Sequence, residues 1–181
     1  MANQCGRRSV PGALRHLEID GCAVVKEAAT DVIALQQALG RPEPWRDPAF
    51  PDQVLALQRK RQRNADAYAR DVLFYDRSPV CTLALCLDLS LAAPPALFDE
   101  VARMTTEHRY ERTVFFIRNQ GFVEATAARR IGFEESLVFE RVHELTYREA
   151  GFVLVDVPAA SLPARVAATR RAASRALPWP K

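Results

Sequence analysis

Four short apolar runs, separated by segments with helical periodicity, are the feature that most constrains the fold. They occupy residues 22–26, 72–75, 113–117 and 152–157. Strands that alternate with helices are typical of crossover units, which build a mostly parallel sheet. The continuous apolar runs at 113–117 and 152–157 are typical of strands that are buried on both faces. The sequence therefore predicts an α/β fold with three layers, in which helices flank a mostly parallel sheet.

The segments between these runs carry helix signals. The expected helices span residues 11–17, 27–39, 52–69, 80–87, 95–108, 136–150 and 162–173. Pro11 and Pro163 suit a first helical turn, and Gly40 and Gly151 suit helix ends. The proline-rich segment 41–51 is expected to be a loop.

Composition narrows the class of protein. A length of 181 residues predicts one domain. The net charge of +3 is compatible with anionic ligands but too small to indicate nucleic-acid binding. The basic clusters at 59–63 and 170–171 are interpreted as solvated helix faces. The sequence has no CxxC pair, and Cys81 and Cys86 are expected to be reduced core residues. No apolar run is long enough to cross a membrane, so a cytoplasmic location is expected.

Polar residues gather where the predicted strands end. Asp76 and Arg77 follow the strand at 72–75, Glu27 follows the first strand, and Arg118 follows the third. Because ligands bind at the carboxyl ends of strands in such sheets, this edge is the predicted site. A carboxylate and a guanidinium at a strand tip are what nucleotide kinases place beside a phosphate. The pattern therefore favours a phosphate ligand.

The ordered motifs resemble a known family. Residues 25–33, 44–48, 74–78, 110–115 and 129–152 are similar, in order, to the AAA-type P-loop domain family related to the ribosylnicotinamide-kinase-like domain of NadR. The resemblance covers about residues 14 to 170. It implies a P-loop NTPase fold of the nucleoside-kinase type over residues 13–175, with a loose tail at 176–181.

One family motif is missing. The family begins with a buried strand and a GxxxxGK[ST] loop whose backbone N–H groups hold the phosphates, and the sequence contains no GK[ST]. Gly6 and Ser9 supply a glycine and a hydroxyl with different spacing. Residues 1–12 are thus expected to be an irregular remnant of, or replacement for, the phosphate loop.

The first strand of the family is also expected to be missing. That strand would be central, between the strands at 72–75 and 113–117. The sequence therefore predicts a gap or a splayed sheet there, together with low stability. A truncated or frame-disturbed N-terminus and a genuine pseudoenzyme are the two explanations.

The resemblance implies roles at the site, each with a structural alternative. Asp76 would hold Mg²⁺ or orient the acceptor, or would cap a helix. Glu27 would be the general base, or a first-turn carboxylate. Arg77 would bind acceptor phosphate, or form a salt bridge. Arg129 and Arg130 would form a lid over the γ-phosphate, or a solvated pair.

Two further residues are candidates for ligand contact. Arg118 would touch base or phosphate. Trp45 would stack on a substrate ring, or would fill a hydrophobic edge.

The function implied is Mg²⁺-dependent transfer of the γ-phosphoryl group of ATP or GTP to a small acceptor or to water. Without the phosphate loop, weak or absent turnover is expected. The alternative is a non-catalytic module of the same fold that binds a ligand or a protein, and a third option is a degenerate fragment that folds poorly. The acceptor, the choice between ATP and GTP, and the oligomeric state stay open.

Overall fold

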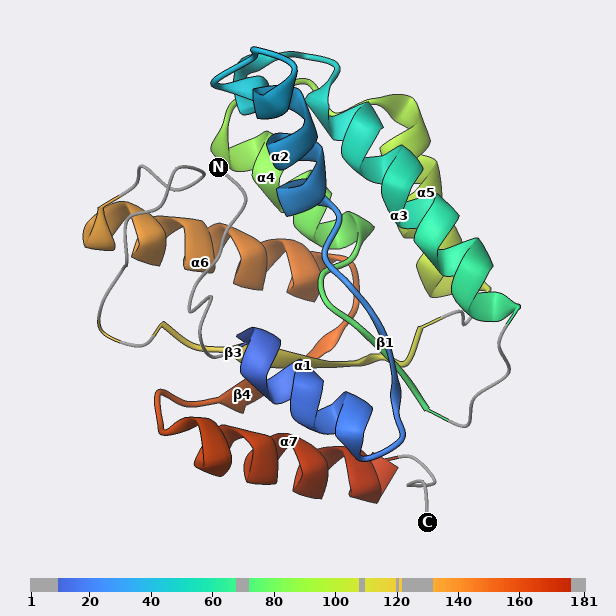
Figure 1. The fold of residues 1–181 in the computed structure, drawn as a ribbon, viewed down its shortest axis with the longest axis vertical. Coiled ribbons are helices and arrows are strands. Elements are labelled where there is room, and N and C mark those ends of the chain that lie inside the picture. Colours follow the sequence, from blue (N-terminus) through green and yellow to red (C-terminus); the bar gives the residue numbers. More distant parts are fainter. Residues whose placement is uncertain (1–9, 68–71, 108–109, 120, 122–131, 177–181) are drawn as a thin grey trace.

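The computed structural model describes residues 10–67, 72–107, 110–119, 121 and 132–176. Four strands alternate with helices along this part of the chain (Figure 1). The elements, in order, are α1 (Val10–Ile19), β1 (Ala23–Val25), α2 (Ala29–Ala38), the 3₁₀ turn η1 (Pro44–Arg46), α3 (Phe50–Asp66), β2 (Leu73–Tyr75), α4 (Pro79–Asp88), α5 (Pro95–Thr106), β3 (Thr113–Ile117), α6 (Phe133–Glu149), β4 (Val153–Val157) and α7 (Leu162–Ala176). The alternation predicted from the sequence is confirmed.

The strands pair in parallel, as predicted. β1 pairs with β2, with Ala23 opposite Leu73, and β3 pairs with β4, with Thr113 opposite Val153. Among the described residues these are two separate two-stranded sheets. Direct pairing of β2 with β3 would have contradicted the expected gap, and it is not seen in this part of the chain. The missing central strand itself stays a prediction.

Helices cover both sides of the β3–β4 pair (Figure 1). α7 packs on β4 and beside α1, and α6 packs on β4 and along α4. The two sheets touch through side chains, because the rings of Phe74 and Phe115 lie 6.3 Å apart between centroids. A mixed α/β fold with parallel strands and flanking helices is therefore observed.

The strands are less buried than predicted. In β3 and β4 only Phe116 and Val157 are fully buried, and Val153 is 61% exposed. Val153 and Asp156 of β4 are both exposed and, three residues apart, point to opposite faces, so the helices leave both faces of this strand partly uncovered. The expectation that both strands are buried on both faces was wrong for this reason.

The largest core cluster lies among helices. Trp45 and Phe50 pack with Ile33 of α2, Leu85 of α4 and Phe139 of α6. The segment 41–51, expected to be a loop, contains η1 and the start of α3, where Pro44 and Pro51 occupy first-turn positions. No helix in the described part of the chain has the length and apolar character needed to span a membrane.

Candidate functional site

A pocket opens between the carboxyl ends of β1 and β2 and the helices α3, α4 and α6. It holds about 310 Å³ of empty space, part of it open to solvent. Its lining residues are Glu27, Ala29, Gln58, Arg77, Cys81, Thr82, Leu85 and Phe139. The set combines one carboxylate, one guanidinium and several neutral polar groups with an apolar wall. Such a mixture of polar and apolar groups is typical of ligand-binding pockets.

Parallel pairing explains why Glu27 and Arg77 meet. β1 and β2 run in register from Ala23 and Leu73, so both strands end at the same edge. The Asp76 N–H then donates to the Val25 carbonyl at 2.8 Å, which extends the ladder by one residue. The structure thus brings Glu27 and Arg77 together at the predicted edge, whereas their chemical roles stay predictions.

Arg77 is held in an unusual backbone conformation. Its φ of 72° lies in the left-handed region, which side chains other than glycine rarely adopt. Burial by itself would lower the pKa of Arg77. Electrostatic interactions with Cys81, Glu27 and Asp76 together outweigh burial, so the pKa of Arg77 is raised. Arg77 therefore keeps its positive charge at the pocket.

Asp76 lies next to this guanidinium but is not a cap. Burial raises the pKa of Asp76, and Arg77 partly offsets that rise. The N-cap of α4 is Ser78, so the alternative interpretation of Asp76 as a helix cap is not what the structure shows. A partly buried carboxylate is stabilised in its charged form by a nearby cation.

Glu27 is fixed from two sides. Its carboxylate accepts a hydrogen bond of 2.9 Å from the Thr30 hydroxyl. The Arg61 guanidinium donates to the backbone carbonyls of Lys26 and Glu27 and pairs with the Asp31 carboxylate. Glu27 lies before α2, which begins at Ala29, so it is not a first-turn residue of that helix.

Two arginines of the basic cluster at 59–63 do not form a solvated face. Arg61 reaches the segment around Glu27, and Arg59 pairs with the buried Glu100 at 2.7 Å. Arg59 contacts α5, whereas Arg61 contacts the segment between β1 and α2, so the two side chains meet neighbours on different sides of α3. The interpretation of these two residues as solvated was wrong, because the charge run by itself does not reveal which side of the helix is packed.

Sequence reasoning missed several pocket residues. Gln58 and Thr82 are joined by a hydrogen bond of 3.1 Å from the Thr82 hydroxyl. Cys81, expected in the core, is half-buried and lines the pocket, whereas Cys86 is buried as expected. These residues belong to amphipathic helical patterns, which carry no signal for a pocket.

His143 lies behind Phe139 of the pocket wall, although no sequence motif singles it out. It is 3% exposed, its ring lies 4.2 Å from the Phe139 ring, and its Nδ1 is 2.9 Å from the Phe139 carbonyl. Burial first, and Arg77 second, lower the pKa of His143 to about 3. It is therefore a neutral imidazole at neutral pH.

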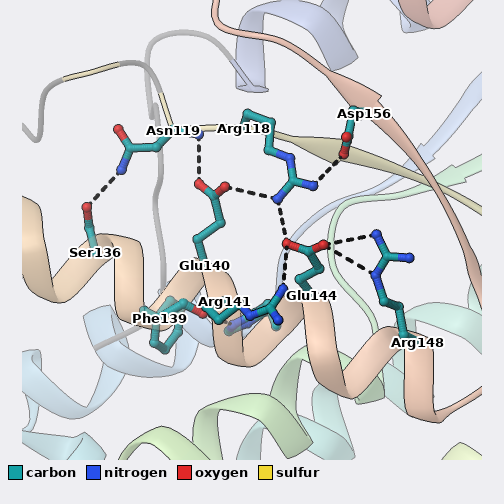
Figure 2. A network of polar contacts seen from close by, with 10 residues as sticks. Arg118, Asn119, Ser136, Phe139, Glu140, Arg141, Glu144, Arg148 and Asp156 are labelled. Atoms are coloured by element: carbon teal, nitrogen blue, oxygen red, sulfur yellow. Dashed lines mark hydrogen bonds and ion pairs between the residues drawn. The ribbon is translucent and has the colours of Figure 1, made fainter.

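Arg118 lies in a separate cluster of charges (Figure 2). Its guanidinium contacts Glu140 at 3.2 Å and Glu144 at 2.8 Å, both on α6, and Asp156 of β4 at 2.8 Å. Hydrogen bonds, chiefly from Arg118, lower the pKa of Glu144 to about 2. The cluster joins β3 and β4 to α6, so the observed contacts of Arg118 are structural, and they give no support to a phosphate-binding role.

The remaining predicted residues fall into two groups. Trp45 is 3% exposed within the core, as expected for a tryptophan that fills a hydrophobic edge rather than one that stacks on a substrate. Gly6, Ser9, Arg129 and Arg130 lie outside the described residues. Among the residues that the structure does describe, no group of three or more His, Cys, Asp or Glu side chains is placed to hold a metal ion.

Comparison with known protein families places the matched region over most of the chain. A family model described as an AAA domain matches residues 12–165. No curated protein and no solved structure matches the chain. The matched region includes every residue that lines the pocket.

Proposed function

Because the chain belongs to the AAA domain family of P-loop NTPases, we propose that it binds ATP or GTP and transfers the γ-phosphoryl group to a small acceptor held in the pocket. The observation that carries this proposal is that Glu27 and Arg77, from two neighbouring parallel strands, line one pocket. A base and a cation beside an acceptor are what such a transfer needs, because its catalysis is mainly positioning and charge stabilisation.

Each residue then has a defined task. Glu27 accepts the proton of the acceptor hydroxyl while the new O–P bond forms and the bond between the γ-phosphorus and the nucleoside diphosphate breaks. The Thr30 hydroxyl occupies one Glu27 oxygen and so orients the carboxylate. Arg77 meets anionic oxygens of the acceptor or of the group being transferred. Without an acceptor, water takes the place of the hydroxyl.

Asp76 is the residue that would hold Mg²⁺, directly or through water. Its carboxylate fits the ion, because Mg²⁺ prefers oxygen ligands and is usually bound by one or two carboxylates together with water and phosphate oxygens. Burial makes the bare charge of Asp76 unfavourable, and a divalent cation would offset that cost. When bound, Mg²⁺ would neutralise phosphate charge.

The residues outside the described ranges complete the proposal. Arg129 and Arg130 would cover the γ-phosphate, and Gly6 and Ser9 would lie beside the other phosphates. These four assignments rest on the family resemblance of the sequence. The kinase-type relation rests on the same resemblance.

Steady-state assays with Mg²⁺ and ATP or GTP test the proposal. The first assay uses water as the acceptor, and the second adds pooled nucleosides as acceptors. Glu27→Gln should lower kcat about 100-fold or more, because a positioned general base typically contributes that much. Asp76→Asn should raise the Mg²⁺ concentration needed for half-maximal rate. Glu149→Gln, an exposed acid on α6, is the matched control and should leave both quantities unchanged. Equal rates in wild type and Glu27→Gln would refute the role of Glu27.

A second candidate function is a non-catalytic binding module. It is favoured by one observation, the absence of any GK[ST] tripeptide from the sequence. Saturable binding of a fluorescent ATP analogue, with no phosphate release and no product from the pooled nucleosides, would support this module over the enzyme. Turnover that requires Asp76 would exclude it.

A further inference from the structure

Ser78 occupies the N-cap position of α4 but does not cap the helix. A serine at this position usually accepts a hydrogen bond from a backbone N–H in the first turn, and the Ser78 side chain makes no such bond. Its hydroxyl lies 2.8 Å from the phenolic oxygen of Tyr147 on α6 instead. The side chain is thus used for a contact between two helices that are distant in sequence.

Tyr147 contacts two residues at the start of α4. Its hydroxyl is 2.8 Å from the Ser78 hydroxyl and 3.0 Å from the Cys81 sulfur. A phenol has one proton to donate and lone pairs to accept, so one hydroxyl can serve both neighbours. The ring is buried and packs edge-to-face on Phe152 at 5.6 Å between centroids, which fixes the direction of the hydroxyl.

Arg77 lies between two anchored residues. On one side the Asp76 N–H donates to the Val25 carbonyl at 2.8 Å, and on the other Ser78 contacts Tyr147. The left-handed backbone of Arg77, at φ 72°, is costly for a residue with a side chain and persists only where the surroundings impose it. The two anchors are the surroundings that do so.

We infer that Tyr147 is a positioning residue, which acts through Ser78 to hold Arg77 in the backbone conformation that places its guanidinium at the pocket. The effect of Tyr147 on a ligand rests on the proposed function of the pocket, whereas its effect on the placement of Arg77 does not. Phe139 of α6 also lines the pocket. This helix therefore positions the Arg77 guanidinium and provides part of the apolar wall.

The first test measures the placement of Arg77 without a ligand. Tyr147→Phe removes only the hydroxyl and keeps the ring on Phe152. Tyr110→Phe is the matched control, because Tyr110 is half-buried, packs on the Tyr75 ring and does not line the pocket. The Nε–H signal of Arg77 in ¹H–¹⁵N spectra, assigned with Arg77→Gln, should shift and exchange faster with water in Tyr147→Phe and not in Tyr110→Phe. An unchanged Arg77 signal in Tyr147→Phe would overturn the inference.

The second test is a double-mutant cycle with inorganic phosphate as the probe. Tyr147→Phe should weaken phosphate binding about tenfold, the effect of roughly one lost hydrogen bond. In the Arg77→Gln background the same substitution should have no further effect, since it acts through Arg77. A tenfold loss in both backgrounds would show a general structural role and would overturn the inference. If Arg77→Gln itself leaves phosphate affinity unchanged, the proposed function fails, and the Arg77 signal alone decides the inference.

A second variant protects the test against misfolding. Ser78→Ala removes the other partner of the hydrogen bond between Ser78 and Tyr147. It does not remove a helix cap, because the Ser78 side chain provides none. It should reproduce the shift of the Arg77 signal, and the combination with Tyr147→Phe should shift that signal no further. A wild-type Arg77 signal in Ser78→Ala would contradict transmission through Ser78.

Discussion

Acidification should destabilise this protein through one buried imidazole. His143 is 3% exposed, contacts Phe139 and faces the Arg77 guanidinium, and its pKa is lowered to about 3. In the unfolded chain its pKa is about 6.5. The unfolded state therefore takes up a proton at a higher pH than the folded state. Stability contributed by the neutral ring is present above about pH 6.5 and is lost as the pH falls toward 3.

The size of the effect follows from these two pKa values. Between pH 7.5 and pH 5 the unfolded state gains about 2 kcal/mol from protonation of this residue, while the folded state gains almost nothing. Glu144 does not contribute in this window, because its pKa is lowered to about 2 by Arg118 and its stabilisation is lost only below about pH 4.5. Asp76 has a raised pKa and acts in the opposite direction, so a variant is needed to isolate His143.

Urea unfolding from pH 5 to pH 7.5 measures the effect. His143→Gln cannot titrate in this range, so its free energy of unfolding should fall by about 2 kcal/mol less than that of wild type over the same range. His16→Gln, an exposed histidine on α1, is the control and should follow wild type. Equal pH dependence in wild type and His143→Gln would refute the reasoning, because it would mean that His143 titrates alike in both states.

Three further substitutions test the packing. Arg118→Ala should lower the free energy of unfolding by about 1–2 kcal/mol, because the mostly buried Glu140 loses its cation, whereas Glu144 keeps Arg148. The exposed Arg41→Ala should cost under about 0.5 kcal/mol in the same urea titration. Trp45→Ala should lower the free energy of unfolding by about 3–5 kcal/mol in the same titration. The milder Trp45→Phe should leave nucleoside affinity unchanged, whereas the loss of an indole that stacked on the nucleoside base would weaken it. Arg61→Lys should lower kcat and change the free energy of unfolding little, because Lys has no second nitrogen with which to keep the Asp31 contact while it donates to the carbonyls of Lys26 and Glu27.

Much of the fold could be predicted because its signals are local. Apolar runs of strand length, proline and glycine at helix ends, and helical periodicity gave the order of elements. The grouping of polar residues at one edge of the sheet could be predicted too, since residues directly after parallel strands share one edge. This is why Glu27 and Arg77 were expected together and are found in one pocket. The observed helix boundaries differ from the predicted ones by a few residues. For example, α3 begins at Phe50, and a 3₁₀ turn lies in the segment before it.

The contacts of individual side chains could not be predicted in the same way. Arg118 follows a strand just as Arg77 does, yet it turns to the acids of α6 instead of the pocket (Figure 2). Arg61 belongs to a run of basic residues that is typical of a solvated helix face, but its guanidinium donates a hydrogen bond to the backbone carbonyl of Glu27. Nothing in either local pattern indicates which neighbour the packed fold supplies.

The α/β alternation, the parallel strands and the polar residues at their carboxyl ends could be inferred from the amino-acid order, because these depend on the chemistry of adjacent residues. Which of those residues line the pocket, and what holds them there, depends on how the helices and strands pack. The link between Ser78 and Tyr147 joins residues 69 positions apart, and the burial that keeps His143 neutral comes from helices packing together. Such effects arise from three-dimensional packing, which no short stretch of sequence encodes.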